Sequence, residues 1–234
     1  MVAITIIISL LPSFTWLIFY LREDYRHPEP KRLLALAFLM GASITVVAFG
    51  LQVAFEGATA GTGVTPYSPI YLFVMAGIEE VAKFFAAYLT VRKSRFFDEP
   101  VDAMIYMITA AMGFAAVENI FAISGATAPF TGQQAYLESV VETTSLRFVG
   151  ATLLHTLSSG IVGYYWARGM AQGRGAAFGL LAWGILAAAA VHAVFNYLIL
   201  KFERDAFIFP TIFLILVAFF VLSDFEKLKK SGSE

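Results

Sequence analysis

Few ionisable side chains lie deep within the apolar stretches of this sequence, and they are of three types: glutamate, histidine and lysine. Those that lie deep within an apolar stretch are Glu79, Glu80, Lys83, Glu118, His155 and His192. A charged side chain in the interior of a bilayer costs a few kcal/mol or more, so such groups usually face a cavity inside the protein and carry a function. These six residues are therefore the candidate functional residues.

Their chemistry predicts a hydrolase that uses water directly. A carboxylate beside an imidazole can act as a general base on water. A second imidazole with an amide one turn later, as in His192 and Asn196, can donate hydrogen bonds to a developing oxyanion. Ser158 and Ser159 lie close to His155 on one predicted helix, which is not an established nucleophile–base geometry. A serine hydrolase is therefore disfavoured.

A metal-dependent version of this site is the alternative. Glutamate and histidine also bind zinc, and the candidate ligands would be Glu79, Glu118, His155 and His192. The sequence has no H-E-x-x-H motif and no two histidines four residues apart, so the metal-free version without a cofactor is favoured and zinc remains the alternative. The absence of cysteine excludes a thiolate metal site and a cysteine nucleophile.

Each candidate also has a structural interpretation. Glu80 and Lys83 are three residues apart and can neutralise each other on one helical face. Glu79 points about 100° away from Glu80 on a helix and is not explained by that pair. A single histidine among apolar residues is often only an interhelical contact. Asn119, which follows Glu118, points elsewhere and has at most a supporting role.

The composition indicates the elements that position these residues. The chain has 234 residues, of which 59% are hydrophobic and 14% charged, with a mean hydropathy of +0.75. Soluble domains are about 45–50% apolar and about 25% charged. The formal net charge is −1. These values exclude a disordered chain, a cytosolic enzyme and a nucleic-acid-binding protein with a basic face, and they predict an integral membrane protein.

Seven apolar runs predict an all-α membrane protein, a polytopic bundle of about seven transmembrane helices in a single integral membrane domain, 1–234. Each run is close to the roughly 20 residues that cross a bilayer, and the runs are 3–21, 33–55, 69–91, 101–123, 146–167, 176–200 and 206–222. The first run has no basic segment before it and no A-x-A-like site after it. We therefore expect a retained helix there rather than a cleaved signal peptide.

Basic residues between the runs predict the orientation, because cytoplasmic loops are enriched in Lys and Arg. On one side they are Arg22, Arg26, Lys31, Arg32, Arg92, Lys93, Arg95, Arg168, Arg174, Lys227, Lys229 and Lys230, and on the other only Lys201 and Arg204. The N-terminus is therefore expected outside and the C-terminus inside. Segment 124–145 would lie outside, either as an amphipathic helix from Gln134 to Leu146 on the outer surface or as an extension of the fifth span, where it could gate substrate access.

The predicted spans place the candidate residues in one layer. At 1.5 Å per residue, the acids and histidines of four helices lie about 8–16 Å below the outer ends of their spans. Unrelated structural polar residues would have no reason to agree in depth. The common depth therefore favours one functional site in the outer half of the membrane.

The motifs that hold these residues resemble those of a known family. They are E-E-x-x-K at 79–83, F-x-x-x-E-N at 114–119 and H-x-x-x-N at 192–196, with His155 between them and D-E-P-x-D at 98–102. In this order they resemble the PrsW family of intramembrane proteases, over a core of about 69–200. That family in turn resembles the larger group of CAAX prenyl proteases and bacteriocin-processing enzymes.

The resemblance implies a glutamate-type intramembrane endopeptidase, a multi-pass protein of a prokaryotic cell membrane. By this analogy Glu79 or Glu80 activates water, while His192 and Asn196 stabilise the tetrahedral intermediate. The wider group usually has a histidine where this chain has Glu118, and His155 could replace it. The implied substrate is a membrane-anchored protein, such as an anti-sigma factor, cut near its extracytoplasmic side.

Two other classes of function remain as alternatives. Buried Glu, His and Lys also form the proton relays and cation sites of transporters. Against a transporter, the sequence shows no internal repeat, and proline is absent from the interior of spans two to six. A non-catalytic membrane scaffold is the third alternative. In every case the expected partners are the lipid bilayer and membrane proteins, and no nucleic acid.

Overall fold

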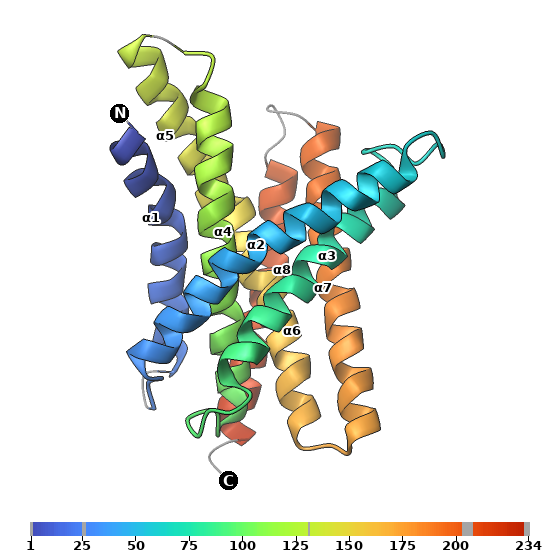
Figure 1. The fold of residues 1–234 in the computed structure, drawn as a ribbon. Helices are drawn as coiled ribbons and strands as arrows, with labels where there is room; N and C mark the ends of the chain where they lie inside the picture. Colours follow the sequence, from blue (N-terminus) through green and yellow to red (C-terminus); the bar gives the residue numbers. More distant parts are fainter. Residues whose placement is uncertain (1, 25–26, 131, 203–207, 232–234) are drawn as a thin grey trace.

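The structure, a computed structural model, describes residues 2–24, 27–130, 132–202 and 208–231. Every regular element in these segments is helical (Figure 1). The elements are α1 (Val2–Leu21), a 3-10 helix (Arg22–Asp24), α2 (Lys31–Thr59), α3 (Pro69–Val91), α4 (Pro100–Thr127), α5 (Gln133–Val149), α6 (Ala151–Met170), α7 (Arg174–Phe202) and α8 (Ile208–Ser231).

The expectation of an all-helical membrane protein is confirmed. Helices α2, α4, α7 and α8 are long and apolar enough to cross a membrane. Helix α3 falls outside this set because Glu79, Glu80 and Lys83 lie together in its middle. Each predicted apolar run lies largely within one helix of the structure. The number of membrane crossings remains a prediction.

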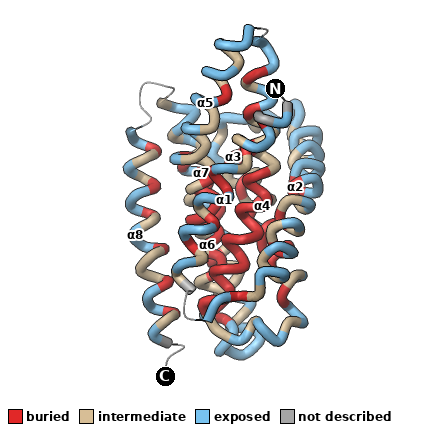
Figure 2. Tube along the Cα trace, turned by 90° about the vertical axis from the view of Figure 1, so that its left-hand side faces the viewer, coloured by how far each residue is buried: buried red, intermediate tan, exposed pale blue. Residues whose placement is uncertain are grey.

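Helix α4 is the centre of the bundle. In the most apolar 18-residue stretch of α4, 89% of the residues are buried, compared with 22% in the corresponding stretch of α2. Figure 2 shows the buried core in red along α4 and α6. The helix begins at Pro100, whose fixed φ suits the first turn. The carboxylate of Asp102 accepts hydrogen bonds from the backbone N–H groups of Asp98 and Glu99, at 3.0 and 2.8 Å.

Helices α1, α2, α3, α5, α6 and α8 contact α4 directly, and α7 packs on α3 and α6. Helices α2 and α3 form a tilted hairpin that crosses the bundle diagonally, and α6 and α7 form a second, steeper hairpin (Figure 1). Helix α1 begins and α8 ends at opposite ends of the bundle (Figures 1 and 2). This arrangement is the one that an odd number of crossings requires.

The segment before the fifth span forms a helix of its own. Residues 146–149, which we assigned to the fifth span, belong to α5, and that span begins only at Ala151. The break occurs at Gly150, whose backbone angles of φ −106° and ψ −97° are not helical. Of the two alternatives for 124–145, the structure therefore supports a separate helix. It packs beside the end of α4, where Ser139 Oγ donates to the carbonyl oxygen of Ala126 at 3.2 Å.

Candidate active site

Helix α3 brings two glutamates and a lysine into the core. The buried side chains recur at helical spacing along it and include Ala76, Glu79, Glu80, Lys83, Ala86 and Ala87. Glu80 and Lys83 are fully buried, and Lys83 Nζ donates to Glu80 Oε1 at 2.6 Å. The expected structural pair therefore exists. Breaking a buried ion pair is costly. The ammonium group of Lys83 therefore stabilises Glu80 as a carboxylate.

Glu80 also orients His192, which comes from α7. The ring atom Nδ1 of His192 lies 2.9 Å from Glu80 Oε1. A carboxylate can only accept a hydrogen bond, so Nδ1 is the donor, and in a neutral ring the opposite nitrogen Nε2 is an acceptor. That Nε2 atom faces Glu79, with 3.7 Å to Glu79 Oε2. The two glutamates therefore have different surroundings, although they are neighbours in sequence.

Glu79 has one oxygen held and one without a hydrogen bond. Its Oε1 accepts a hydrogen bond of 2.9 Å from Nε2 of Gln52, a residue of α2. Its Oε2 is buried and has no hydrogen-bond partner among the described residues. A buried acceptor without a partner is uncommon and costly. Glu80 Oε2 is likewise buried without a partner among the described residues, so Glu79 Oε2 is distinguished by its position 3.7 Å from His192 Nε2, where the two atoms can share a water or an ion.

His155, from α6, is held at both ring nitrogens. Lys83 Nζ lies 3.0 Å from Nδ1, and Glu118 Oε2 lies 2.7 Å from Nε2. Since an ammonium can only donate and a carboxylate can only accept, Nδ1 is the acceptor and Nε2 the donor. His155 and His192 meet edge to face, with their ring centroids 5.2 Å apart. The site thus joins α3, α4, α6 and α7 through direct contacts.

Two polar residues of this cluster had no role in the sequence analysis. Gln52 reaches Glu79 from α2, as described above, and Arg147 at the end of α5 donates to Glu118 Oε2 at 3.2 Å. Gln52 is a single amide in an apolar run, a signal that sequence reasoning could have used. Arg147 is a charged residue inside a predicted span, and the misplaced start of that span concealed its relation to Glu118.

The remaining predicted residues lie outside this centre. Asn119 is fully buried and hydrogen-bonds Arg147 and Thr152, which ties α4 to α5 and α6. Asn196 is half-buried one turn beyond His192, and in the described part of the chain no hydrogen bond joins it to the cluster. Ser158 Oγ donates to the backbone oxygen of His155 and not to its ring. This contact does not support a serine nucleophile.

Three of these side chains lie close enough together to hold a metal ion, although both ring nitrogens of His155 are already hydrogen-bonded. One ligand atom each from Glu79, His155 and His192 lies within 4.8 Å of the others. Glu79 Oε2 and His192 Nε2 lie 3.7 Å apart, and Glu80, which contacts the other ring nitrogen of His192, is a carboxylate of the kind that supports a metal-bound imidazole. Glu118, the fourth ligand proposed from the sequence, instead contacts His155 and Arg147.

Comparisons with known proteins all lead to one family. A sequence model described as "PrsW family intramembrane metalloprotease" matches residues 29–223. Protease PrsW of Geobacillus kaustophilus is 28% identical over 186 residues, which cover 80% of this chain and 75% of that protein.

Two further relatives carry the same name. Protease PrsW of Clostridioides difficile is 24% identical over 94% of this chain and 90% of that protein, and Protease PrsW of Bacillus subtilis is 30% identical over 46% of this chain and 47% of that protein. No solved structure matches this chain. The family match sets aside the transporter alternative. This chain belongs to the PrsW family and is an intramembrane protease.

Proposed function

We propose that this protease hydrolyses a membrane-anchored protein with a water molecule activated by Glu79. The observation that carries this assignment is the buried Oε2 of Glu79, which has no hydrogen-bond partner among the described residues and lies 3.7 Å from His192 Nε2. A water placed there can donate one hydrogen bond to each atom. Oε2 of Glu80 is also buried without a hydrogen-bond partner among the described residues. We assign the base to Glu79 because Oε1 of Glu80 is engaged by both Lys83 and His192.

The hydrolysis follows from these positions. Glu79 removes a proton from the water, the water oxygen attacks the carbonyl carbon of the scissile peptide, and Glu79 then returns the proton to the leaving nitrogen. Glu80 positions His192, and Lys83 keeps Glu80 charged. His192 shares the attacking water through Nε2, whereas Asn196 remains the candidate donor to the oxyanion. This division of roles makes Glu79 the base of the E-E-x-x-K motif.

A metal-dependent version is the second candidate, favoured by the description of the family as metalloproteases and by the group of three ligand atoms. Glu79, His155 and His192 would hold the ion, and His155 would first release Lys83 or Glu118. When bound, a divalent ion such as zinc would supply Lewis-acid activation of the same water. In both versions the chain's own residues bind and orient that water.

We also propose the wider setting of the reaction. The chain forms one membrane domain, with its N-terminus outside and the site in the outer half of the bilayer. The substrate is cut near its extracytoplasmic side, and an anti-sigma factor is the candidate class. The order of the motifs further relates the chain to the CAAX prenyl protease group, in which the double-glutamate helix supplies the base.

Reconstituted protein and a panel of single-span substrates test the role of Glu79. We expect Glu79→Gln to abolish cleavage and Glu80→Gln to weaken it, while both variants insert normally. Glu138→Gln is the matched control, because Glu138 lies on α5 outside the site and contacts Gln134. Near-normal turnover of the Glu79→Ala/Glu80→Ala double variant would refute the glutamate hypothesis.

Chelation separates the two versions. Treatment with 1,10-phenanthroline, with its non-chelating 1,7 isomer as the control, leaves a metal-free protease active and inactivates a metal-dependent one. Elemental analysis of the purified wild type and of His192→Ala gives a readout that does not depend on activity. Zinc in the wild type that is lost in His192→Ala, together with inactivation by the chelator, would establish the metal-dependent version.

A further inference from the structure

One cavity on the side of the bundle has both an apolar and a polar wall. It measures about 510 Å³ and lies between α2, α4 and α5. Its apolar wall consists of Val46, Phe49, Phe114 and Phe121, and its polar wall consists of Thr45, Gln52, Glu118 and Arg147. We call this cavity the α2–α4 groove.

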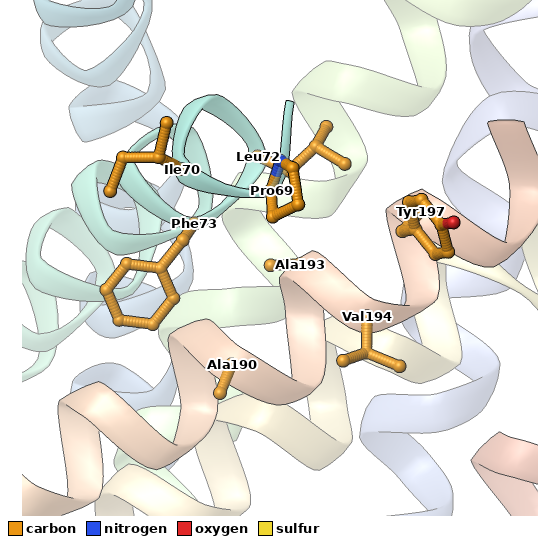
Figure 3. Close-up of a pocket in the computed structure, with 8 residues that line it drawn as sticks. All are labelled: Pro69, Ile70, Leu72, Phe73, Ala190, Ala193, Val194 and Tyr197. Atoms are coloured by element: carbon orange, nitrogen blue, oxygen red, sulfur yellow. The ribbon is translucent and has the colours of Figure 1, made fainter. Parts of the chain in front are cut away.

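Two further cavities are lined almost entirely by apolar groups. The first, of about 480 Å³, lies between α3 and α7 (Figure 3), and the phenol of Tyr197 is the polar group in its wall. The second, of about 670 Å³, lies between α2, α3 and α7 and has no polar side chain in its wall. Lipid chains suit such surfaces. The α2–α4 groove therefore stands apart by its amide, carboxylate and guanidinium groups.

The polar wall of the groove is in direct contact with the proposed site. Gln52 donates to Glu79 Oε1 at 2.9 Å, and Glu118 Oε2 lies 2.7 Å from His155 Nε2. Gln52 therefore lines the groove and contacts the proposed base directly. The outer wall is open, since Val46, Phe49 and Phe121 are 71%, 66% and 70% exposed. A segment within the bilayer can reach these three side chains.

A peptide bond that is to be hydrolysed in a membrane needs such a surface. The substrate segment must leave its helix to expose the scissile bond, and its N–H and C=O groups then lose their partners. In hydrocarbon each unsatisfied backbone group costs several kcal/mol. Gln52 and Arg147 can donate to the freed carbonyl groups, and Glu118 can accept from the freed N–H groups.

We propose that the α2–α4 groove binds the transmembrane segment of the substrate. The segment enters from the lipid between α2 and α4, packs its apolar side chains on Phe49 and Phe121, and unwinds beside Gln52 so that the scissile bond reaches Glu79. This inference rests on the proposed function. It names the route and the binding surface, which the proposed chemistry leaves open.

Because the chain has no cysteine, cross-linking can test the route directly. Single variants Phe49→Cys and Phe121→Cys are made in the inactive Glu79→Gln background, with Val194→Cys as the matched control. Val194 lies two residues from His192 but lines the α3–α7 cavity of Figure 3. The probe is a single-span protein that the wild type cleaves, with one cysteine placed next to its cleavage site. We expect disulfide cross-links from positions 49 and 121 and none from 194.

A second arm fills the groove without touching the proposed chemistry. Val46→Trp should lower cleavage about tenfold or more, because displacing a bound substrate by about 1 Å costs on the order of 10²-fold in rate. Val194→Trp should leave the rate within about twofold. Val46 is mostly exposed, so the larger side chain has room and the fold is expected to be retained.

The outcomes separate the two proposals. If the wild type cleaves no substrate in the panel, the proposed function fails and the groove assignment fails with it. If the wild type cleaves the probe, but cross-links form at position 194 and not at 49 and 121, or Val46→Trp cleaves at the wild-type rate, the groove assignment alone is overturned.

Discussion

The Glu80 carboxylate connects Lys83 with His192 in the centre of the site. Its Oε1 accepts from Lys83 at 2.6 Å and from His192 at 2.9 Å, and no part of its side chain is exposed. A buried charge is tolerated when it is paired and hydrogen-bonded. Lys83 in turn reaches His155. One ion pair therefore fixes the orientation of both histidines, so a structural role for Glu80 and Lys83 and a functional role of the cluster are compatible.

Removal of Lys83 should destabilise the protein. Lys83→Met leaves Glu80 buried without its counter-ion, and breaking one partner of a buried pair costs about 3–5 kcal/mol. For a protein of this size, that loss corresponds to a decrease in Tm on the order of 10 °C. Thermal unfolding of the purified protein in detergent measures the change.

The double variant Lys83→Met/Glu80→Gln is the internal control, and it should recover part of the lost Tm because both charges are then gone. Lys227→Met should have little effect, because the pair of Lys227 and Asp224 is at the surface and such pairs contribute about 0–1 kcal/mol. An unchanged Tm in Lys83→Met would show that the Lys83–Glu80 pair does not stabilise the folded protein.

Gln52 is expected to affect the rate of cleavage more than stability. Gln52→Leu removes the hydrogen bond to Glu79 Oε1, and hydrogen bonds to charged groups are worth about 1.5–3 kcal/mol. This loss corresponds to a decrease of roughly 10- to 100-fold in kcat/KM. Cleavage kinetics in liposomes measure it.

The control for Gln52 is Ser43→Ala on the same helix, since Ser43 Oγ donates to the backbone oxygen of Leu39 in its own helix. We expect this variant to cleave at the wild-type rate. Equal kinetics of Gln52→Leu and the wild type would mean that Glu79 needs no support from α2.

At the scale of helices, the sequence predicted the helix bounds well where an apolar run was long and uninterrupted. The run 69–91 coincides with α3, Pro69–Val91. The prediction was wrong where one apolar run contained a break, because Gly150 alone does not distinguish a kink from a continuous helix. Counting depth along separate helices indicated that Glu79, His155 and His192 meet. It could not show how the side chains pair, because that depends on how each helix is rotated.

Close packing of α2 on α4 should depend on two glycines. A Cβ on Gly113 would lie 1.8 Å from the carbonyl oxygen of Phe38, and one on Gly41 would lie 1.9 Å from that of Ala110. Backbone atoms cannot move aside as a side chain can, so Gly113→Ala must push α2 away. We expect a loss of about 1–3 kcal/mol and reduced cleavage, because Gln52 moves with α2.

Gly50→Ala is the matched control for these variants. A Cβ on Gly50 meets nothing within 4 Å, and alanine favours a helix over glycine by about 0.8–1 kcal/mol. Thermal unfolding should therefore rank Gly50→Ala at or above the wild type, and Gly113→Ala and Gly41→Ala below it. The reverse order would mean that α2 and α4 are not packed at these positions.

At the scale of the whole molecule, contacts between distant segments gather the basic residues at one end. Lys229 pairs with Glu23 at 2.8 Å, and His27 lies 2.5 Å from Glu99. Lys227 and Arg168 both lie over the ring of Tyr164. The C-terminal ends of α1, α3, α6 and α8 therefore lie at the same end of the bundle, as the alternation of spans requires.

This gathering leads to a prediction of topology. Since basic segments stay in the cytoplasm, the shared end should face the cytoplasm, and the α4–α5 connection should lie outside. Phe130→Cys and Lys230→Cys place single cysteines at the two ends of a chain that otherwise has none. A membrane-impermeant maleimide should label position 130 in intact cells, and position 230 only after the membrane is permeabilised.

The same experiment tests the proposed depth of the site. If 130 is outside, Glu79 and the histidines lie in the outer half of the bilayer, where an extracytoplasmic cleavage can occur. Labelling of both positions from the same side would contradict the seven-span arrangement. Labelling of position 230 alone in intact cells would show that the orientation in the membrane is inverted. The site would then lie toward the cytoplasm. The proposed extracytoplasmic cleavage would then be wrong, while the contacts among Glu79, Glu80, His155 and His192 would stand.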